Sequence, residues 1–417
     1  MASLREEIES RRTFAIISHP DAGKTTLTEK LLLYGGAIQT AGSVKGKQSA
    51  KHAVSDWMDI EKQRGISVTS SVLQFNYQGK CINILDTPGH QDFSEDTYRT
   101  LMAADCAVMV IDAAKGVEAQ TIKLFKVCTL RHIPIFTFVN KMDREARDPF
   151  ELMENIEEIL GIKTYPMNWP ISCGKDFKGV YDRNAKRVLA FESDGRANGV
   201  KMVDEIEAEL GDPALDALIG AANHQKLADD IELLDGAAEE FDLAAVQHGE
   251  LSPVFFGSAL TNFGVEPFLK EFLRLTPTPL PRKDSVSGEL VDPCSEQFSG
   301  FVFKIQANMN KNHRDRIAFL RICSGKFERG MEAFHVQEGK NIKLATGTSL
   351  MADDRAIVSE AYAGDIIGLF DPGVFSIGDT LCTGKKHVQF AGIPTFAPEH
   401  FSRVTQVDTM KRKQFVK

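Results

Sequence analysis

Residues 18–26, with the sequence SHPDAGKTT, have the types and spacing of a phosphate-binding loop. An apolar run precedes them and an amphipathic run follows, which is the strand–loop–helix context that such a loop needs. Gly23 would let backbone N–H groups approach phosphate oxygens, Lys24 would reach the β- and γ-phosphates, and the Thr25 hydroxyl would bind Mg²⁺. Ser18 replaces the first glycine of the general pattern, and the alternative is a chance glycine-rich turn. The predicted nucleotide contacts here are Ser18, His19, Pro20, Asp21, Ala22, Gly23, Lys24, Thr25 and Thr26.

A second group of chemically useful residues, Asp86-Thr87-Pro88-Gly89-His90, follows another apolar strand. Asp86 would hold Mg²⁺ through water, Gly89 would offer an N–H group to the γ-phosphate, and His90 would orient an attacking water. The alternatives are an ordinary Asp-Pro-Gly turn and a surface histidine that begins a helix.

A long segment, residues 35–71, has no apolar period in its first half and is predicted to be a functional loop. In it, the Ser67 hydroxyl would complete the Mg²⁺ coordination when a γ-phosphate is present. Ser67 would otherwise simply begin a strand.

The run Asn140-Lys141-Met142-Asp143, again after an apolar strand, predicts recognition of guanine. Guanine presents two adjacent donors that the Asp143 carboxylate can accept, and adenine lacks this pair, so a buried Asp143 would reject ATP. Asn140 would tether the loop, and Lys141 would stack along the base. Further along, Ser258, Ala259 and Leu260 form the last loop, in which backbone N–H groups would face the guanine oxygen.

The elements that position these loops alternate between apolar strands and helices from residue 13 onward. This pattern predicts a doubly wound α/β domain with a mostly parallel sheet, and each loop follows the carboxyl end of a strand, where such sheets bind ligands. Residues 162–250 are interpreted as an insertion, helical in its acidic part, 201–250. A proline-rich linker ends at residue 281, and short strands with glycine turns then predict a small antiparallel β-barrel over residues 282–392.

The composition of the 417-residue chain is that of a globular protein with two or three domains, 43% apolar and 26% charged. The amino-terminal residues do not form a signal peptide, no run approaches a membrane span, and the seven cysteines lack CxxC pairs, so a reducing, cytoplasmic location without a membrane partner is expected. The net charge is −9, of which residues 201–250, with fourteen acidic side chains and two lysines, supply −12. The remaining +3 is compatible with an RNA-rich partner, whereas no DNA partner is expected.

Together these motifs resemble the translational GTPases of the elongation-factor-G branch, through SHPDAGKTT, DWMDIEKQRGIS, DTPGHQDF and NKMD. Four details resemble the family of bacterial peptide chain release factor 3: Ser18-His19-Pro20, Ser67 in place of threonine, the NWPI segment with FKGVYDR, and the short insertion. The resemblance implies a P-loop GTPase domain over residues 1–281, the β-barrel as a second domain, and residues 393–417 as the incomplete start of an α+β third domain.

The resemblance also implies activity and partners. The family hydrolyses GTP to GDP and phosphate on the ribosome, with Mg²⁺ as cofactor, and recycles the codon-reading release factors after peptide release. It implies Mg²⁺ on Thr25 and Ser67, a cation-binding or loop-ordering role for Asp21, and a water-orienting His90 screened by Pro20 and Ile66. Partners would be guanine nucleotide, ribosomal RNA and proteins, and the release factors. The alternatives are a translocation GTPase and a nucleotide-loaded ribosome-binding module that does not require hydrolysis.

Overall fold

The computed structural model describes most of the chain: residues 2–38, 71–87, 94–191, 205–237, 240–307, 316–344, 347–351 and 354–391, with residues 402–403, 405–408, 410 and 412. The predictions for Ile66, Ser67, Pro88, Gly89 and His90 therefore lie outside the described residues, as does most of the predicted loop 35–71. None of the helices in the described ranges has the length and apolarity to cross a membrane.

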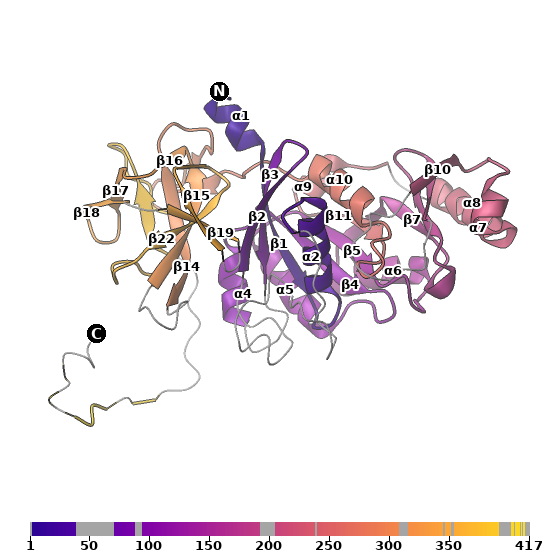
Figure 1. Cartoon of the computed structure of the whole chain (residues 1–417), viewed down its shortest axis with the longest axis horizontal. Helices are drawn as coiled ribbons and strands as arrows, with labels where there is room; N and C mark the ends of the chain where they lie inside the picture. The colour runs from indigo at the N-terminus through magenta and orange to yellow at the C-terminus, as the bar shows by residue number, and fades with distance from the viewer. Residues whose placement is uncertain are drawn as a thin grey trace.

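A seven-stranded sheet forms the centre of the molecule (Figure 1), in the order β2-β3-β1-β4-β5-β11-β6. Only β2 runs antiparallel, in a hairpin with β3, and the other neighbouring pairs are parallel. The strands are β1 (Arg11–Ser18), β2 (Ser71–Tyr77), β3 (Lys80–Asp86), β4 (Cys106–Asp112), β5 (Ile135–Asn140), β6 (Lys163–Pro166) and β11 (Leu251–Phe256). The predicted doubly wound, mostly parallel sheet is confirmed.

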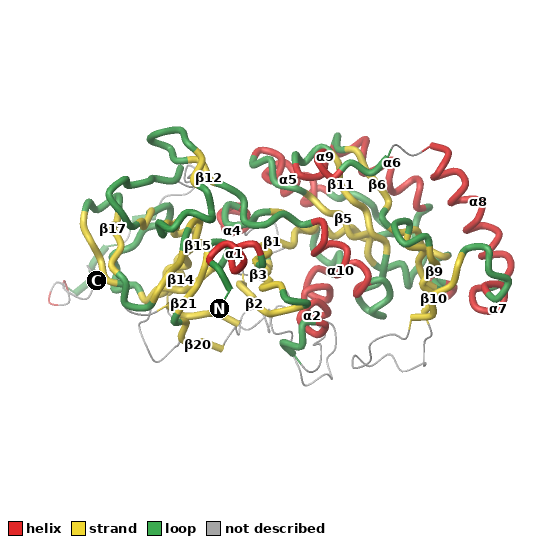
Figure 2. Tube along the Cα trace, turned by 90° about the horizontal axis from the view of Figure 1, so that it is seen from above, coloured by secondary structure: helices red, strands yellow, loops and turns green. Residues whose placement is uncertain are grey.

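Helices cover both faces of this sheet because its strands are apolar on both sides. Along β1, Phe14 and Ile16 pack into the cluster that holds α2 (Lys24–Tyr34) and α10 (Val265–Leu275). Ala15 and Ile17 pack into the opposite cluster, with α4 (Ser94–Leu101) and α5 (Ala119–Leu130). Figure 2 shows α2 and α10 on one side of the strands and α5 on the other. The remaining helices of this region are α6 (Pro149–Leu160) and α9 (Leu243–Gln247).

A second, antiparallel sheet extends from the end of the molecule that carries α6 (Figure 1). Its strands, in the order β10-β9-β8-β7, are β7 (Asn168–Ile171), β8 (Gly179–Asp182), β9 (Arg187–Phe191) and β10 (Glu205–Glu209). The short 3-10 helix η2 (Gly174–Asp176) and the helices α7 (Leu215–Ile219) and α8 (Ala221–Ala237) complete this region.

Two features of this inserted region differ from the sequence-based expectation. The strand β6 belongs to the main sheet, so the inserted region begins after Pro166 and not at residue 162. Residues 205–209 were expected to be helical but form β10, because Ile206 and Ala208 alternate with glutamates and pack against the inserted sheet's core. The helices α7, α8 and α9 do follow, as expected for the rest of the acidic part.

The second domain is built on an eight-stranded antiparallel sheet that curls around its own apolar core, as the β-barrel prediction required. Its order is β18-β17-β23-β14-β15-β22-β19-β20, and short strands pair beside it as β16-β21 and β12-β13. The bounds are β12 (Arg282–Lys283), β13 (Leu290–Val291), β14 (Ser299–Ala307), β15 (Arg316–Ser324), β16 (Lys326–Glu328), β17 (Glu332–His335), β18 (Lys340–Lys343), β19 (Gly347–Met351), β20 (Asp354–Val358), β21 (Glu360–Tyr362), β22 (Ile366–Phe370) and β23 (Thr380–Cys382). The amino-terminal helix α1 (Leu4–Glu9) contributes Ile8, 1% exposed, to this core.

Buried polar contacts join the two domains. Arg321 of β15 and Asp105, the residue before β4, form an ion pair of 2.5 Å with both side chains 1% exposed. The Asp365 carboxylate accepts from the Asn83 side chain at 3.3 Å and from Arg11 Nε at 3.3 Å. Burial, with the Asp365 charge as the next cause, raises the pKa of Cys81 to about 12. The second domain is therefore attached to β1 and β3, the strands that lead into the first two functional loops.

Candidate nucleotide-binding site

The phosphate loop connects β1 to α2 in a conformation that depends on Gly23. This residue has φ 99° and precedes the first helical residue, Lys24. A side chain at Gly23 would also collide with the Asn140 amide, so glycine is needed for both backbone angle and space. The first N–H groups of a helix have no acceptor within the helix, and those of α2 therefore make this loop suited to an anion. The Ala22 N–H is already used within the loop, donating to His19 O at 3.3 Å.

A buried pair of opposite charges stands at the edge of the sheet beside this loop. The Lys24 ammonium contacts Asp86 Oδ1, and the two side chains are 5% and 2% exposed. Thr28 Oγ1 also donates to the same carboxylate oxygen at 3.5 Å. The hydroxyl of Thr87, the next residue along the chain, donates a hydrogen bond to Ile16 O at 2.7 Å. The structure thus brings a cation that suits phosphate and a carboxylate that suits a divalent metal to one place.

The other predicted residues of the phosphate loop lie around this pair. Thr25 and Thr26 are half-buried in the first turn of α2, and Pro20 is half-buried in the loop. Ser18 Oγ donates to the carbonyl of His19 at 2.9 Å. His19 Nε2 lies 3.5 Å from Glu118 Oε1.

Asn140 joins three loops through the two ends of its amide. Its Nδ2 donates to Ala22 O at 2.9 Å, and its Oδ1 accepts from the Ala259 N–H at 2.9 Å. Because the side chain is 2% exposed, it fixes the loop after β5 between the phosphate loop and the loop after β11. The predicted tethering geometry is therefore present.

Asp143, the predicted reader of guanine, is held by a hydroxyl. Ser258 Oγ donates to Asp143 Oδ1 at 2.6 Å, and the Asp143 side chain is 16% exposed. Arg144 Nε lies 4.0 Å from Asp143 Oδ2. The Arg144 side chain is 63% exposed, so solvent screens its charge. A half-buried carboxylate with one oriented oxygen is thus available to a ligand.

The loop after β11 differs in detail from the expectation that its backbone N–H groups face the guanine oxygen. The Ser258 N–H donates to Phe263 O at 2.9 Å, and the Ala259 N–H donates to Asn140. Both donors are thus used within the protein, and the two residues support Asp143 and Asn140. Leu260 is 59% exposed at the surface of this loop.

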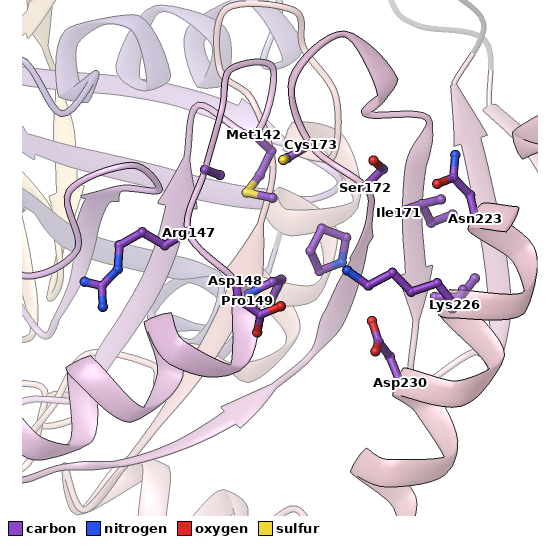
Figure 3. A pocket seen from close by; sticks show the side chains of 13 residues that line it. Met142, Arg147, Asp148, Pro149, Ile171, Ser172, Cys173, Asn223, Lys226 and Asp230 are labelled. Carbon is purple, nitrogen blue, oxygen red and sulfur yellow. The ribbon is translucent and has the colours of Figure 1, made fainter.

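Met142 does not face the nucleotide loops, since its side chain is buried in the core between the main and inserted sheets. A cavity of about 240 Å³ lies beside it, between the guanine loop and α8 (Figure 3). Across the cavity's edge, the Gly174 N–H donates to Met142 O at 2.8 Å and to Arg144 O at 3.0 Å. The inserted region therefore supports the backbone of the guanine loop, a role that its sequence did not indicate.

Lys141 has a partner that the sequence analysis did not assign. Its ammonium donates to Asp21 O at 2.6 Å and lies 2.6 Å from Asp112 Oδ2. Asp112 is the last residue of the apolar strand β4, so its position at a strand end was the available signal.

Comparisons with known proteins agree with this arrangement. The model of the elongation factor Tu GTP binding domain matches residues 9–278, and that of elongation factor G domain 2 matches residues 297–384. A peptide chain release factor 3 from Symbiobacterium thermophilum is 63% identical over 418 residues, which cover 100% of this chain and 78% of that protein. Proteins of the same name from Ligilactobacillus salivarius and Lacticaseibacillus casei are 56% and 57% identical, each over 99% of this chain and 78% of theirs.

Among solved structures, a crystal structure of a protein from Thermus thermophilus superposes with a TM-score of 0.71 at 26% identity. The match covers 92% of this chain and 56% of that one. With a GTP-binding domain, a second domain of the elongation-factor-G type and relatives this similar, the chain belongs to the peptide chain release factor 3 family of translational GTPases.

Proposed function

We propose that this chain is a ribosome-dependent GTPase of translation termination, which hydrolyses GTP to GDP and phosphate and recycles the codon-reading release factors after peptide release. The observation that carries the proposal is the meeting of the Lys24–Asp86 pair with the Asn140, Asp143 and Ser258 cluster at one edge of the sheet. Membership of the release factor 3 family supports the reaction and its place in termination.

Guanine selection rests on Asp143. Its carboxylate accepts the N1–H and the exocyclic amine of guanine, and Ser258 keeps it oriented. Adenine lacks this pair of donors, so the partly buried carboxylate would lose its contacts with the base without full access to water, which disfavours ATP. Asn140 and Lys141 hold the loop against the phosphate loop while the base is bound.

Phosphate binding uses Lys24 and the N–H groups at the start of α2. The γ-phosphate would draw the Lys24 ammonium away from Asp86, which frees this carboxylate to hold a Mg²⁺-bound water. The donor set of a half-buried Thr25 hydroxyl and a buried Asp86 carboxylate fits Mg²⁺, a hard cation that takes oxygen ligands. Ser67 would supply a second hydroxyl oxygen. When bound, the ion neutralises charge on the β- and γ-phosphates.

Hydrolysis requires a water in line with the γ-phosphorus. We assign His90 to orient this water, whose oxygen forms the new bond to phosphorus as the bond to the β–γ bridging oxygen breaks and GDP leaves. Pro20 and Ile66 would screen the water from bulk solvent. Resemblance to the family supports these three roles, and ribosomal RNA would place His90 for catalysis.

The ribosome supplies the partners: ribosomal RNA and proteins, and the codon-reading release factors bound there. A cytoplasmic location follows from this proposal. We take residues 1–281 as the GTPase domain, residues 282–392 as the second domain and residues 393–417 as the start of a third, with the family models at 9–278 and 297–384 as support.

A release assay tests the proposal. Ribosomes that have released their peptide and still carry a labelled codon-reading release factor are mixed with the protein and GTP. Loss of the label that requires both GTP and this protein is expected. Retention of the label, with translocation of a pre-translocation complex instead, would favour the elongation-factor-G alternative. Equal loss with a non-hydrolysable GTP analogue over many rounds would favour a binding module.

A further inference from the structure

Asp112 forms a buried ion pair at the end of β4. Its Oδ2 lies 2.6 Å from Lys141 Nζ, and the side chains of Asp112 and Lys141 are 7% and 19% exposed. The same ammonium donates to the carbonyl of Asp21 in the phosphate loop at 2.6 Å. One lysine therefore connects the end of β4, the guanine loop and the phosphate loop.

The backbone explains how Lys141 reaches both partners. Asp112 pairs in register with Asn140 on β5, so the two strands end side by side. Lys141 then has φ 73°, a left-handed conformation that non-glycine residues seldom adopt and that is found where surrounding contacts hold it. This turn directs the side chain across the strand ends, toward the phosphate loop.

The carboxylate of Asp112 is itself held by the turn that follows β4. Its Oδ1 accepts the Ala114 N–H at 3.0 Å, while its carbonyl accepts the N–H groups of Lys115 at 3.0 Å and Gly116 at 2.9 Å. The turn after β4 thus holds one oxygen of Asp112 and leaves the other for Lys141. A carboxylate in this position needs no rearrangement to receive the lysine.

We propose that Asp112 is a positioning residue that holds Lys141 against the phosphate loop and thereby slows the release of guanine nucleotide. This inference rests on the proposed function, in which Lys141 holds the guanine loop against the phosphate loop while the base is bound. Without the Asp112 charge, the lysine would keep one partner and sample other rotamers, so the guanine and phosphate loops would separate more often.

The test is the dissociation rate of a fluorescent GDP from the Asp112→Asn variant. Asparagine keeps the shape of the side chain and an oxygen for the Ala114 N–H. It presents a neutral amide to Lys141 in place of the negatively charged oxygen of Asp112. Release about tenfold faster is expected, a size typical of losing one hydrogen bond to a charged group, with the association rate within about twofold of wild type. Asp182→Asn is the matched control, since Asp182 also accepts two N–H groups in a turn, those of Asn184 and Ala185, far from the phosphate loop.

A double-mutant cycle separates positioning from general support of the fold. In a Lys141→Met background, Asp112→Asn should change GDP release less than about twofold, because its target is gone. Unchanged release in the single variant, or full additivity in the cycle, would overturn the inference. If Asp112→Asn does not fold, Lys141→Met alone must show the acceleration, and normal release there overturns the inference equally. A wild-type protein that does not bind the fluorescent GDP would overturn the proposed function and this inference together.

Discussion

The hydroxyl of Ser258, after β11, donates a hydrogen bond of 2.6 Å to Oδ1 of Asp143, after β5. Two loops separated by 115 residues in sequence thus determine where one carboxylate points. A carboxylate oxygen has two lone pairs, so Oδ1 can accept the serine and still receive a donor from a base, while Oδ2 receives the second. Under the proposed function, guanine selection depends on a carboxylate held in this orientation, which an amide in its place cannot reproduce.

Exchange of this carboxylate for an amide should change the preferred base. Asp143→Asn is expected to weaken GTP binding by roughly 2–4 kcal/mol, the size of a charge-assisted bidentate contact, and to favour XTP, whose 2-oxo group matches an amide donor. Titration with fluorescent GTP and XTP measures both affinities. Arg144→Ala serves as the control, since its exposed side chain should leave both unchanged. If Asp143→Asn binds GTP and XTP with wild-type affinities, Asp143 does not contact the base.

The Lys24–Asp86 pair predicts two separable effects of one substitution. Lys24→Ala should reduce GTP and GDP affinity by about a hundredfold or more, because the phosphates lose a charge partner. It should also destabilise the nucleotide-free protein by about 3 kcal/mol, because the buried Asp86 carboxylate loses its charge partner. Adding Asp86→Asn should restore stability but not binding. Thermal unfolding measures the stability and nucleotide titration measures the affinity. Lys115→Ala, at an exposed site, is the control. Recovery of both stability and affinity in the double variant would contradict this account.

The domain junction makes a prediction that does not involve nucleotide. Arg321 and Asp105 are both 1% exposed, so Arg321→Met should lower the free energy of unfolding by about 3–5 kcal/mol through the uncompensated Asp105 charge. Arg321→Met with Asp105→Asn should regain most of this loss. Calorimetric unfolding measures it, and Lys386→Met, which breaks an exposed pair with Glu289, should change nothing. A loss in Lys386→Met equal to that in Arg321→Met would show that burial is not the cause.

Sequence reasoning was most successful where a strand pattern and a loop motif coincided. The positions of Lys24, Asp86, Asn140 and Asp143 follow from apolar strands that end at the same edge of a parallel sheet. Contacts between distant loops were less accessible. Ser258 and Ala259 were expected to turn their backbone N–H groups to the base, because their own motif does not reveal that the Ser258 hydroxyl meets Asp143 and the Ala259 N–H meets Asn140. β6 was placed in the insertion because its pairing with β11 crosses more than 80 residues of intervening chain, and no local pattern encodes such a pairing.

His90, outside the described residues, carries the catalytic prediction. A residue that orients water is needed in the transition state but contacts little of the bound nucleotide, so His90→Ala should leave GTP and GDP affinities within about threefold. Ribosome-stimulated hydrolysis should fall about a hundredfold, or roughly 3 kcal/mol of barrier, while the slow intrinsic rate should change little. Quench-flow measurements on ribosomes with saturating protein check this. If His90→Ala hydrolyses GTP on ribosomes at the wild-type rate, another group orients the attacking water.

This chain hydrolyses GTP, and ribosomes drive the reaction. Single-turnover hydrolysis of radiolabelled GTP, with and without ribosomes that have released their peptide, tests it most directly. Acceleration of at least about a hundredfold by ribosomes, absent in Lys24→Ala and with ATP in place of GTP, is the predicted result. Equal rates with and without ribosomes, while GTP stays tightly bound, would contradict the claim and leave a nucleotide-dependent binding protein instead.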